Sequence, residues 1–305
     1  MTRFGYACLN MTLREKNIFT SRTMRKKTFL EKGLPYTSKL ILENVKDLVK
    51  ILNWNSKNNI KVFRISSQLM PWASEYELEH LPDFEQISYF LKIAGAFATK
   101  KELRLSFHPG QFNCLASEKE NVVLNCIKDL EIHGKIFDIM KMSRTHYNKI
   151  NIHLGSTCNG NLEKAKDNFC RNFDKLSDSV KTRLTVENDD KAGMFSTKFL
   201  YENIFKEINV PIVFDSHHFE LGPQDSTYEE AFNMAYESWR NIKPVCHHSN
   251  GKKEYEDQSI RSKAAHSNYY YKPFNDLGKS VDVVLEAKFK EVALKKYLHD
   301  FVCNN

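Results

Sequence analysis

Eight short apolar runs, separated by stretches in which apolar residues recur at helical spacing, dominate this chain. The runs cover residues 3–8, 60–66, 102–107, 149–154, 182–187, 210–215, 243–247 and 281–286. Spacings of three and four are clear after Ser38 and after Ser117. Strand–helix repeats without an intervening linker predict a parallel sheet covered by helices. We therefore expect residues 1–305 to form a single α/β domain, a (β/α)8 TIM barrel.

Residues that can bind metal stand where these runs stop. They are His108, His153, Glu187, Asp215, His218, His247 or His248, His266 and Glu286. All except His266 follow an apolar run. The carboxyl ends of barrel strands form one rim, whereas an open doubly wound sheet, the alternative fold, usually concentrates its site at one switch point. The distribution therefore favours the barrel.

The types of these residues indicate the metal. Histidine and carboxylate together suit Zn²⁺, Mn²⁺ or Fe²⁺, and a carboxylate can bridge two ions ~3.5–4 Å apart. One histidine on an apolar run is more often a core residue, but the joint occurrence is hard to explain as core or surface. We expect a cluster of two or three divalent ions, with Glu187, His108 and Asp215 at the catalytic centre.

Three connections, residues 11–36, 66–82 and 248–274, are too long to be simple turns. All run from a strand to a helix, so they should rise over the face that carries the ligands. The first is rich in lysine and arginine, the second offers Trp72 and Tyr76, and the third interleaves lysine and arginine with tyrosines; the net charge is +7. A charge run is usually only a solvated face, but basic and aromatic side chains around a metal cluster predict a groove for a phosphate backbone.

Composition excludes several classes of protein. No stretch reaches the ~20 apolar residues of a membrane span. The start of the chain, MTRFGYACLN, lacks the charged and then apolar pattern of a signal peptide. The seven cysteines are scattered without a CxxC pair, which argues against a zinc finger or a disulfide framework. We expect an intracellular protein, and an exposed catalytic groove suits a monomer.

The turn after the first histidine of the row suggests contact with nucleic acid. Pro109 and Gly110 force a turn directly after His108 and project Gln111 and Phe112 above the rim. The aromatic ring can stack on a base and the amide can hydrogen-bond to a base edge. The alternative is that Phe112 is buried under a neighbouring loop.

Taken together, the motifs FGYACLN, FRISS, FHPGQ, HLG, ENDD, DSHH, AHSNY and VLEAK resemble those of the UV damage endonucleases. The resemblance covers nearly the whole chain. It implies a TIM barrel with a metal cluster, commonly described with manganese. It also implies an enzyme that nicks double-stranded DNA 5′ to ultraviolet photoproducts and, in some members, to abasic sites.

The resemblance also implies roles for individual residues. Metal ligation falls to His108, His153, Glu187, Asp215, His218, His266 and Glu286. Contacts with the distorted bases fall to Tyr6, Gln111 and Phe112. Asn10, Arg64 and Ser67 would be further groove residues or would support the ligands.

One segment departs from the family pattern. The family has Lys-x-His at the end of the seventh strand, where the lysine is a modified metal ligand, and this chain has PVCHHS at 244–249. Alignment on the proline and serine places His247 at the histidine and Val245 at the lysine. A slip of one residue makes His248 the ligand instead. In either case the modified lysine is missing.

These observations predict metal-assisted phosphodiester hydrolysis that leaves 3′-hydroxyl and 5′-phosphate ends. Manganese is the expected ion, with zinc or iron as alternatives. An abasic-site enzyme resembling endonuclease IV is the nearest alternative function. A sugar isomerase or epimerase of the xylose-isomerase-like group would need a closed small-molecule pocket. A DNA-binding barrel without metals would not need so many filled ligand positions.

Overall fold

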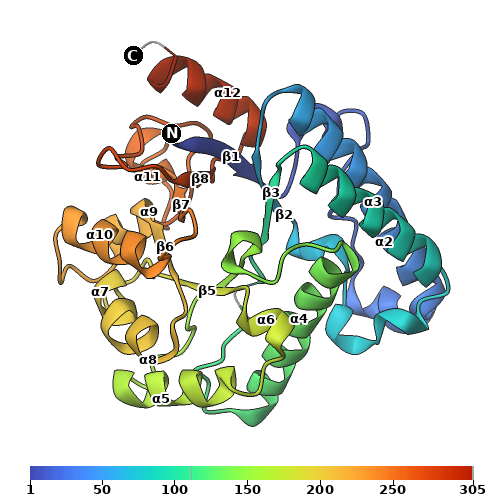
Figure 1. The fold of residues 1–305 in the computed structure, drawn as a ribbon, viewed down its shortest axis with the longest axis horizontal. Coiled ribbons are helices and arrows are strands. Elements are labelled where there is room, and N and C mark those ends of the chain that lie inside the picture. Colours follow the sequence, from blue (N-terminus) through green and yellow to red (C-terminus); the bar gives the residue numbers. More distant parts are fainter. Residues whose placement is uncertain (111, 304–305) are drawn as a thin grey trace.

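The computed structural model describes residues 1–110 and 112–303, and its centre is a closed barrel of eight parallel strands (Figure 1). Each strand pairs with its neighbour in the sequence, and β8 returns to β1 through the register Arg3↔Asp282 to Tyr6↔Leu285. The strands are β1 (Arg3–Ala7), β2 (Val62–Ile65), β3 (Arg104–Phe107), β4 (Ile150–Ile152), β5 (Leu184–Glu187), β6 (Ile212–Asp215), β7 (Val245–His248) and β8 (Asp282–Leu285). The predicted barrel is confirmed, and every strand lies at a predicted apolar run.

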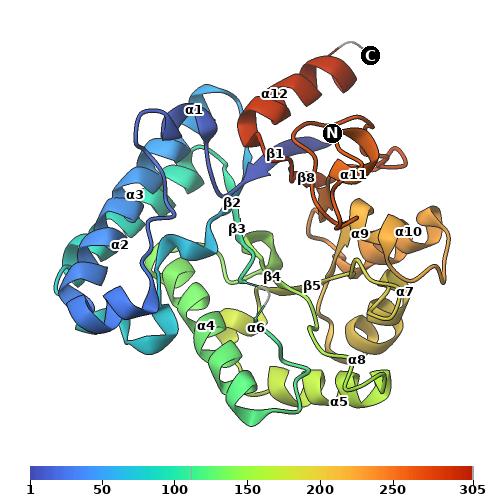
Figure 2. The same ribbon diagram turned by 180° about the vertical axis from the view of Figure 1, so that it is seen from behind.

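Helices surround the barrel and cover the outward faces of its strands (Figures 1 and 2). The α-helices are α1 (Met11–Arg14), α2 (Lys26–Lys57), α3 (Phe84–Lys100), α4 (Glu120–Ile139), α5 (Leu162–Phe173), α6 (Asp178–Lys181), α7 (Thr197–Leu200), α8 (Lys206–Ile208), α9 (Ser216–Leu221), α10 (Tyr228–Ser238), α11 (Lys252–Tyr255) and α12 (Lys290–Phe301). Helix α12 packs beside β1, so the two ends of the chain lie on the same side of the molecule in both views. None of the helices among the described residues has the length and apolar character needed to cross a membrane.

Apolar side chains at helical spacing explain why the outer ring packs on the sheet. On α2 the buried face includes Ile41, Val45, Leu48 and Leu52, all of which are at most 8% exposed. Burial of such side chains contributes roughly 1.5–3 kcal/mol each before conformational entropy is counted. The large core between strands and helices therefore accounts for the ring.

Asp83 and Asp225, each shortly before a helical stretch, are the N-caps that the sequence predicts. Asp83 stands at the N-cap of α3, but its carboxylate accepts a hydrogen bond from the Ser38 hydroxyl at 2.8 Å instead of capping the helix. The prediction that Asp225 caps α10 is wrong, since its carboxylate accepts instead from the Ser196 hydroxyl at 2.5 Å. Thr227 begins that helix in a capping box with Glu230, because its hydroxyl sits where it can accept from the Glu230 amide.

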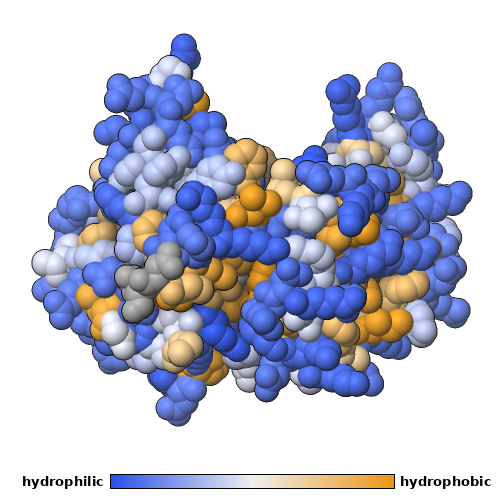
Figure 3. All heavy atoms as spheres, turned by 90° about the horizontal axis from the view of Figure 1, so that it is seen from above, coloured by the Kyte–Doolittle hydropathy of each residue, from blue (hydrophilic) through white to orange (hydrophobic). Residues whose placement is uncertain are grey.

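The three long strand-to-helix connections are more structured than the sequence suggests. Residues 66–82 contain three 3₁₀ turns, and residues 248–274 contain α11. The first connection is shorter than predicted, because α2 begins at Lys26 and bends at Gly33, whose φ of 58° and ψ of −160° lie outside the helical region. Seen from above, the molecule has two projections on one side with a hollow between them (Figure 3).

The amino-terminal end of the barrel is closed by buried charges. Asp282 accepts hydrogen bonds from Arg3 at 2.7 Å and from Arg104 at 3.0 Å. Arg104 is 1% exposed and lies over the ring of Tyr147. The buried Asp282 and Arg104 and the partly exposed Arg3 are held together by charge-assisted hydrogen bonds. This end of the barrel is therefore sealed, and an opening to the interior can lie only at the carboxyl end.

Candidate metal centre

Seven side chains from six strand ends converge at the carboxyl end of the barrel. Among the described residues they form three overlapping groups of possible metal ligands, and within each group the ligand atoms lie within 4.8 Å of one another. The groups are His108, Glu187 and His247, then His153, Glu187 and His218, then Asp215, His247 and Glu286. Each residue lies within one position before and three positions after the end of its strand, as the row of strand-end residues predicted.

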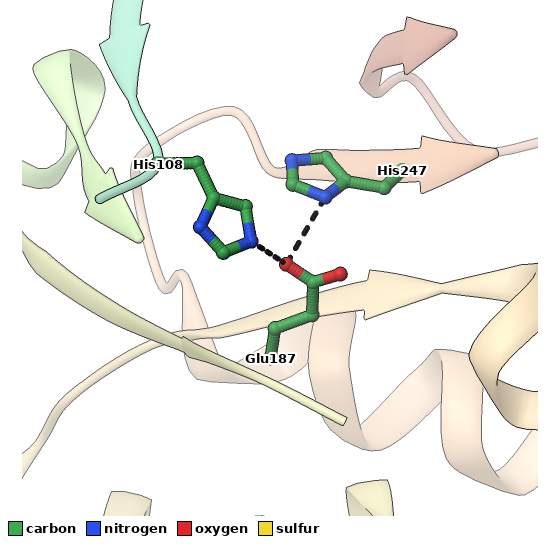
Figure 4. A group of neighbouring side chains, drawn as sticks. All are labelled: His108, Glu187 and His247. Carbon is green, nitrogen blue, oxygen red and sulfur yellow. Dashed lines mark ion pairs between the residues drawn. The ribbon is translucent and has the colours of Figure 1, made fainter. Parts of the chain in front are cut away.

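Glu187 is at the centre of this arrangement (Figure 4). Its Oε2 atom lies 3.2 Å from Nε2 of His108 and 3.1 Å from Nδ1 of His247. Its Oε1 atom lies 3.2 Å from Nδ1 of His218. The two oxygens of one carboxylate thus face two different groups of possible ligands, so Glu187 could serve both groups if each held a cation.

A second carboxylate, Glu286, serves the other side of the cluster. Its Oε1 atom lies 3.3 Å from Nδ1 of His247 and also forms an ion pair with the guanidinium of Arg64. His266 stands further out, with its Nε2 atom 3.8 Å from Oε2 of Glu286, and belongs to none of the three groups. It reaches the edge of the centre from the long connection after β7, where it forms an isolated bridge with Gly251.

The structure separates the two histidines that the sequence left as alternatives. His247 faces Glu187 and Glu286, and its buried Nδ1 atom has no hydrogen-bond partner. His248 points outward, where Nδ1 is 2.7 Å from the Ser216 hydroxyl and Nε2 is 3.1 Å from the Lys272 carbonyl oxygen. Both ring nitrogens of His248 are engaged, so His247 is the histidine that the cluster can use.

Charge determines the protonation of the cluster. Burial raises the pKa of Glu187, but the imidazoles of His247, His108 and His218 outweigh it and hold the pKa well below its ordinary value. Burial also opposes ionisation of Glu286, whose pKa is nonetheless held well down by Arg64 and His247. Both glutamates are therefore carboxylates at neutral pH, ready to bind a cation.

The histidines divide into two kinds. Burial lowers the pKa of His108 to about 4, so this imidazole is neutral at pH 7. Burial acts in the same direction on His218, but Asp215 and Glu187 reverse it and raise the pKa well above its ordinary value. A neutral imidazole can donate a lone pair to a metal at once, whereas a charged one must first lose a proton.

The donor set fits divalent cations. Asp215, Glu187 and Glu286 are at most 13% exposed, and Arg64 is the one arginine paired with them among the described residues. Buried carboxylates need compensating charge or hydrogen bonds. Oδ2 of Asp215 and Nδ1 of His153, His247 and His266 are buried without hydrogen-bond partners in the described part of the chain. Cations bound between these atoms would satisfy both demands.

A cavity of about 390 Å³ opens beside the cluster. His108, His153 and His218 line one side of it, and Phe112 and Met194 line another. The metal-ligand candidates are therefore accessible from the carboxyl face rather than sealed in the barrel. A reacting group brought to this face would meet the imidazoles directly.

Comparison with known proteins gives this geometry a family. The family described as UV-endonuclease UvdE matches residues 2–303. The chain belongs to the UV damage endonuclease family. The family inferred from the motifs is thereby confirmed, and the protein is a DNA repair endonuclease, which makes it a nuclease and a hydrolase.

Individual relatives extend over nearly all of the chain. The UV DNA damage endonuclease of Clostridium perfringens is 33% identical over 306 residues, which cover 97% of this chain and 70% of that protein. The UV-damage endonuclease of Schizosaccharomyces pombe is 35% identical over 305 residues, and the match spans about half, 49%, of that longer protein. The crystal structure of SacUVDE superposes with a TM-score of 0.84 at 29% identity, covering 98% of this chain and 97% of that one.

Sugar epimerases share the barrel but not the sequence. D-psicose 3-epimerase from Clostridium cellulolyticum H10 aligns with a TM-score of 0.54 at 10% identity, over 93% of this chain and 84% of that chain. A likeness at this identity reports the fold alone. The isomerase alternative is thus compatible with the barrel fold, but the family match does not support it.

The residues expected to contact DNA in this UV damage endonuclease lie in different places. Phe112 is 84% exposed beside the cavity, so it is not buried under a loop. Arg64 is on β2 at the rim and is held by Glu286. Gln111 lies outside the described residues.

Tyr6 and Asn10 do not lie where base contacts require. Both are fully buried. The Tyr6 hydroxyl donates to Asn55 at 2.6 Å and accepts from Asn10 at 2.8 Å, and Asn10 also caps α1 by accepting from the Leu13 amide at 2.8 Å. In this structure the pair connects β1 with α1 and α2 and offers no surface to DNA. This corrects the expectation that Tyr6 contacts distorted bases and that Asn10 lines the groove.

The supporting residues were missed by sequence reasoning. Asn151 donates to Glu187 and accepts from the Thr185 hydroxyl at 2.8 Å. Asp189 lies 3.1 Å from Nδ1 of His153. Asp189 could have been found from its place in the run ENDD, but nothing in the sequence marks Asn151, because its role depends on the register between β4 and β5.

The family's expected lysine on β7 is indeed Val245 here, 1% exposed and packed in the small apolar cluster inside the barrel. A lysine nevertheless reaches the centre from another strand. The Nζ atom of Lys149, just before β4, lies 3.0 Å from Nε2 of His247. Sequence reasoning gave no signal for this contact.

Proposed function

We propose that this chain uses a cluster of two or three divalent cations to nick damaged double-stranded DNA by phosphodiester hydrolysis. The cut would lie 5′ to ultraviolet photoproducts, with abasic sites as a second class of lesion. The observation that carries the proposal is that the three groups of possible ligands overlap: Glu187 belongs to two of them, and His247 belongs to two. A single-ion site would not need two shared residues.

The proposed ligands are those that the geometry brings together, namely His108, His153, Glu187, Asp215, His218, His247 and Glu286, with His266 at the edge. Imidazole and carboxylate ligands in this ratio suit manganese, and zinc and iron are the alternatives. When bound, such cations lower the pKa of water and stabilise negative charge on a leaving oxygen. By binding the cations, Glu187, His108 and Asp215 would fix the position of the positive charge that faces the reacting phosphate.

The protein's own residues would supply the positive charge and the orientation. Arg64 is fixed by Glu286 at the rim, where its guanidinium can neutralise a phosphate oxygen. Burial lowers the pKa of His108 to about 4, so this imidazole is neutral and can bind a cation at the edge of the cavity without first losing a proton. No side-chain nucleophile is required for this chemistry.

Recognition of the lesion would use the exposed ring beside the cavity. Phe112 is large, apolar and solvent-exposed, a combination that costs free energy unless a partner covers it. Damaged base steps are easier to unstack and kink than intact ones, so an aromatic wedge discriminates in their favour. We propose that Phe112 and Gln111 enter the duplex at the lesion and that Arg64 holds the backbone.

Wider features of the chain agree with a DNA partner. The connections that carry the basic residues rise on the carboxyl side of the strands, and the net charge is +7. Counterion release from the backbone would then provide much of the affinity. We propose an intracellular monomer built on a single barrel, since one face carries both the metal ligands and the groove.

The test uses three end-labelled duplexes of one sequence (intact, irradiated and abasic) with Mn²⁺, and repeats the irradiated duplex with a chelator in place of Mn²⁺. We expect nicks 5′ to the photoproduct only when Mn²⁺ is present, with a 3′-hydroxyl that a polymerase can extend. Glu187→Gln should abolish both nicking and metal binding, and Glu230→Gln, a surface capping residue, should retain both. Nicking that persists in the chelator would overturn the metal proposal. Cleavage of abasic DNA alone would favour the endonuclease IV-like alternative.

A further inference from the structure

The inward face of β4 is polar throughout. Lys149, Asn151 and His153 alternate with Ile150 and Ile152, at the spacing of two that places side chains on one face of a strand. Barrel interiors of this kind are filled mainly by bulky branched apolar residues. Asn151 donates a hydrogen bond to Glu187, and His153 belongs to the candidate cluster. Lys149 is therefore the one of these three polar residues to which the proposed function gives no role.

Lys149 is an unusual residue for its position. It is 0% exposed, and its side chain crosses the barrel from the start of β4 to β7. Among the described residues its amine has no carboxylate partner, and its one hydrogen-bond contact is Nε2 of His247 at 3.0 Å. Burying a lysine without an ion pair is costly. A residue kept at such cost needs a role.

The contact determines how His247 faces the cluster. Nδ1 of His247 lies 3.1 Å from Glu187 and 3.3 Å from Glu286, and Nε2 lies on the opposite edge of the ring, against Lys149. Rotation of the ring by half a turn would put carbon atoms toward the two carboxylates and break the contact with the amine. For Nδ1 to bind a cation the ring's proton must be on Nε2, from which it would be donated to the lone pair of the Lys149 amine.

We propose that Lys149 is a positioning residue for His247, which it holds from beneath so that Nδ1 points at the space between Glu187 and Glu286. The inference rests on the proposed function to the extent that this space holds a cation. Lys149 itself touches neither substrate nor metal. Its amine reaches His247 on β7 from the start of β4. Val245, the buried residue two positions before His247 on β7, is apolar and cannot form such a hydrogen bond.

The experiment compares the wild type with Lys149→Met, which keeps the length of the side chain and removes the amine. Affinity for Mn²⁺, measured by competition with a chelating dye, should fall about 10- to 100-fold, the usual effect of losing a residue that orients a ligand. Lys243→Met is the matched control. Its amine pairs with Asp282 at 3.1 Å at the sealed end, so its loss should leave the affinity unchanged.

A double variant separates positioning from a general loss of structure. If Lys149 acts through His247, then Lys149→Met should lower the Mn²⁺ affinity of the wild type but add nothing in a His247→Ala background. Equal losses in both backgrounds would overturn the proposal, as would full affinity in Lys149→Met. Lys149→Gln, which keeps a polar end, should lie between wild type and Lys149→Met, and it stands in if the methionine variant does not fold.

A measurement without metal separates this proposal from the proposed function. In metal-free protein labelled with ¹⁵N-histidine, the Nε2 resonance of His247, identified by its loss in His247→Ala, should shift in Lys149→Met and not in Lys243→Met. An unchanged resonance would overturn the Lys149 contact even if the enzyme binds Mn²⁺. If the resonance shifts as expected but wild type binds no Mn²⁺, the proposed function fails and the positioning contact stands.

Discussion

The side chain of Asn188 bonds both backbone polar groups of Asp215: its Nδ2 atom donates to the carbonyl oxygen at 3.0 Å, and its Oδ1 atom accepts from the amide at 2.9 Å. This pair fastens the end of β5 to the end of β6 within the metal centre. Oδ1 of Asp215 accepts from the amides of His217 and His218, and Oδ2 is left buried without a partner among the described residues. Oδ1 of Asp215 thus stabilises the turn into α9, and Oδ2 is left available to bind a cation.

Replacing Asn188 with alanine should therefore affect both stability and metal binding. Two buried backbone groups lose their partner, which typically costs roughly 1–3 kcal/mol for each unsatisfied group. The affinity for Mn²⁺ should fall ~10- to 100-fold, as expected when a group that orients a ligand is lost. Urea unfolding of the metal-free protein measures the first effect and a chelator competition measures the second. Asn203→Ala, which removes one bond within a distant helix, is the control, and an unaltered affinity in Asn188→Ala would contradict the expectation.

The two adjacent histidines of β7 should respond differently to the same substitution. His247→Gln should lose bound metal and nicking, because its Nδ1 atom is a ligand candidate in two groups. His248→Gln should keep both and lose stability, because it breaks the contacts with Ser216 and with the Lys272 carbonyl. Metal analysis after dialysis, alongside thermal unfolding, gives the two readouts. Loss of metal in His248→Gln with retention in His247→Gln would reverse the assignment.

The contrast between these histidines shows what the sequence can and cannot provide. The alternation of apolar runs predicted the barrel, and the place where each run stops predicted seven of the converging side chains, since all strands of such a barrel end on one rim. The choice between His247 and His248 depends on the register of β7, because a shift of one residue reverses the face on which a side chain lies. Register is a property of the closed sheet and cannot be seen in one strand.

Contacts between side chains on different strands of the barrel are still harder to predict from the sequence. Lys149 and His247 are on non-adjacent strands, and Asn151 meets Glu187 only because of the β4–β5 pairing. Tyr6 illustrates the opposite error. Its motif suggested contact with DNA, but its side chain points into the helix layer and is fully buried. Motif position gave the right strand and the wrong face.

The exposed ring of Phe112 predicts a change in selectivity rather than in chemistry. Phe112→Ala should retain metal content but lose most of the preference for irradiated over intact duplex, because a base–aromatic stack is worth ~1–3 kcal/mol. The ratio of nicking rates on the two duplexes measures it, and removal of Gln111 as well should abolish the preference. Phe289→Ala, a ring 38% exposed on another loop, is the control. A preserved rate ratio in Phe112→Ala would reject the wedge.

Metal binding should strengthen as the pH rises through neutrality. In the metal-free protein burial lowers the pKa of His218, but Asp215 and Glu187 outweigh it and raise the pKa well above 6.5, and His153 is raised in the same way by Asp189. Both must be deprotonated before they bind a cation, so loading releases protons. Each proton released weakens the apparent affinity by about tenfold for each pH unit of acidification. His108, with its pKa lowered to about 4, adds nothing to this dependence above pH 5.

Calorimetric titration with Mn²⁺ in buffers of different ionisation enthalpy counts these protons directly. Between pH 6.5 and 8 the observed heat should vary with the buffer. Because the buffer takes up the released protons, the heat should be more exothermic in buffers with a larger ionisation enthalpy. His218→Gln should release fewer protons than the wild type, whereas His299→Gln, an exposed histidine on α12, should release the same number. A heat independent of buffer would mean that His218 and His153 are already neutral before metal arrives, and that the carboxylates around them do not hold the proton that their 3.1–3.2 Å separations imply.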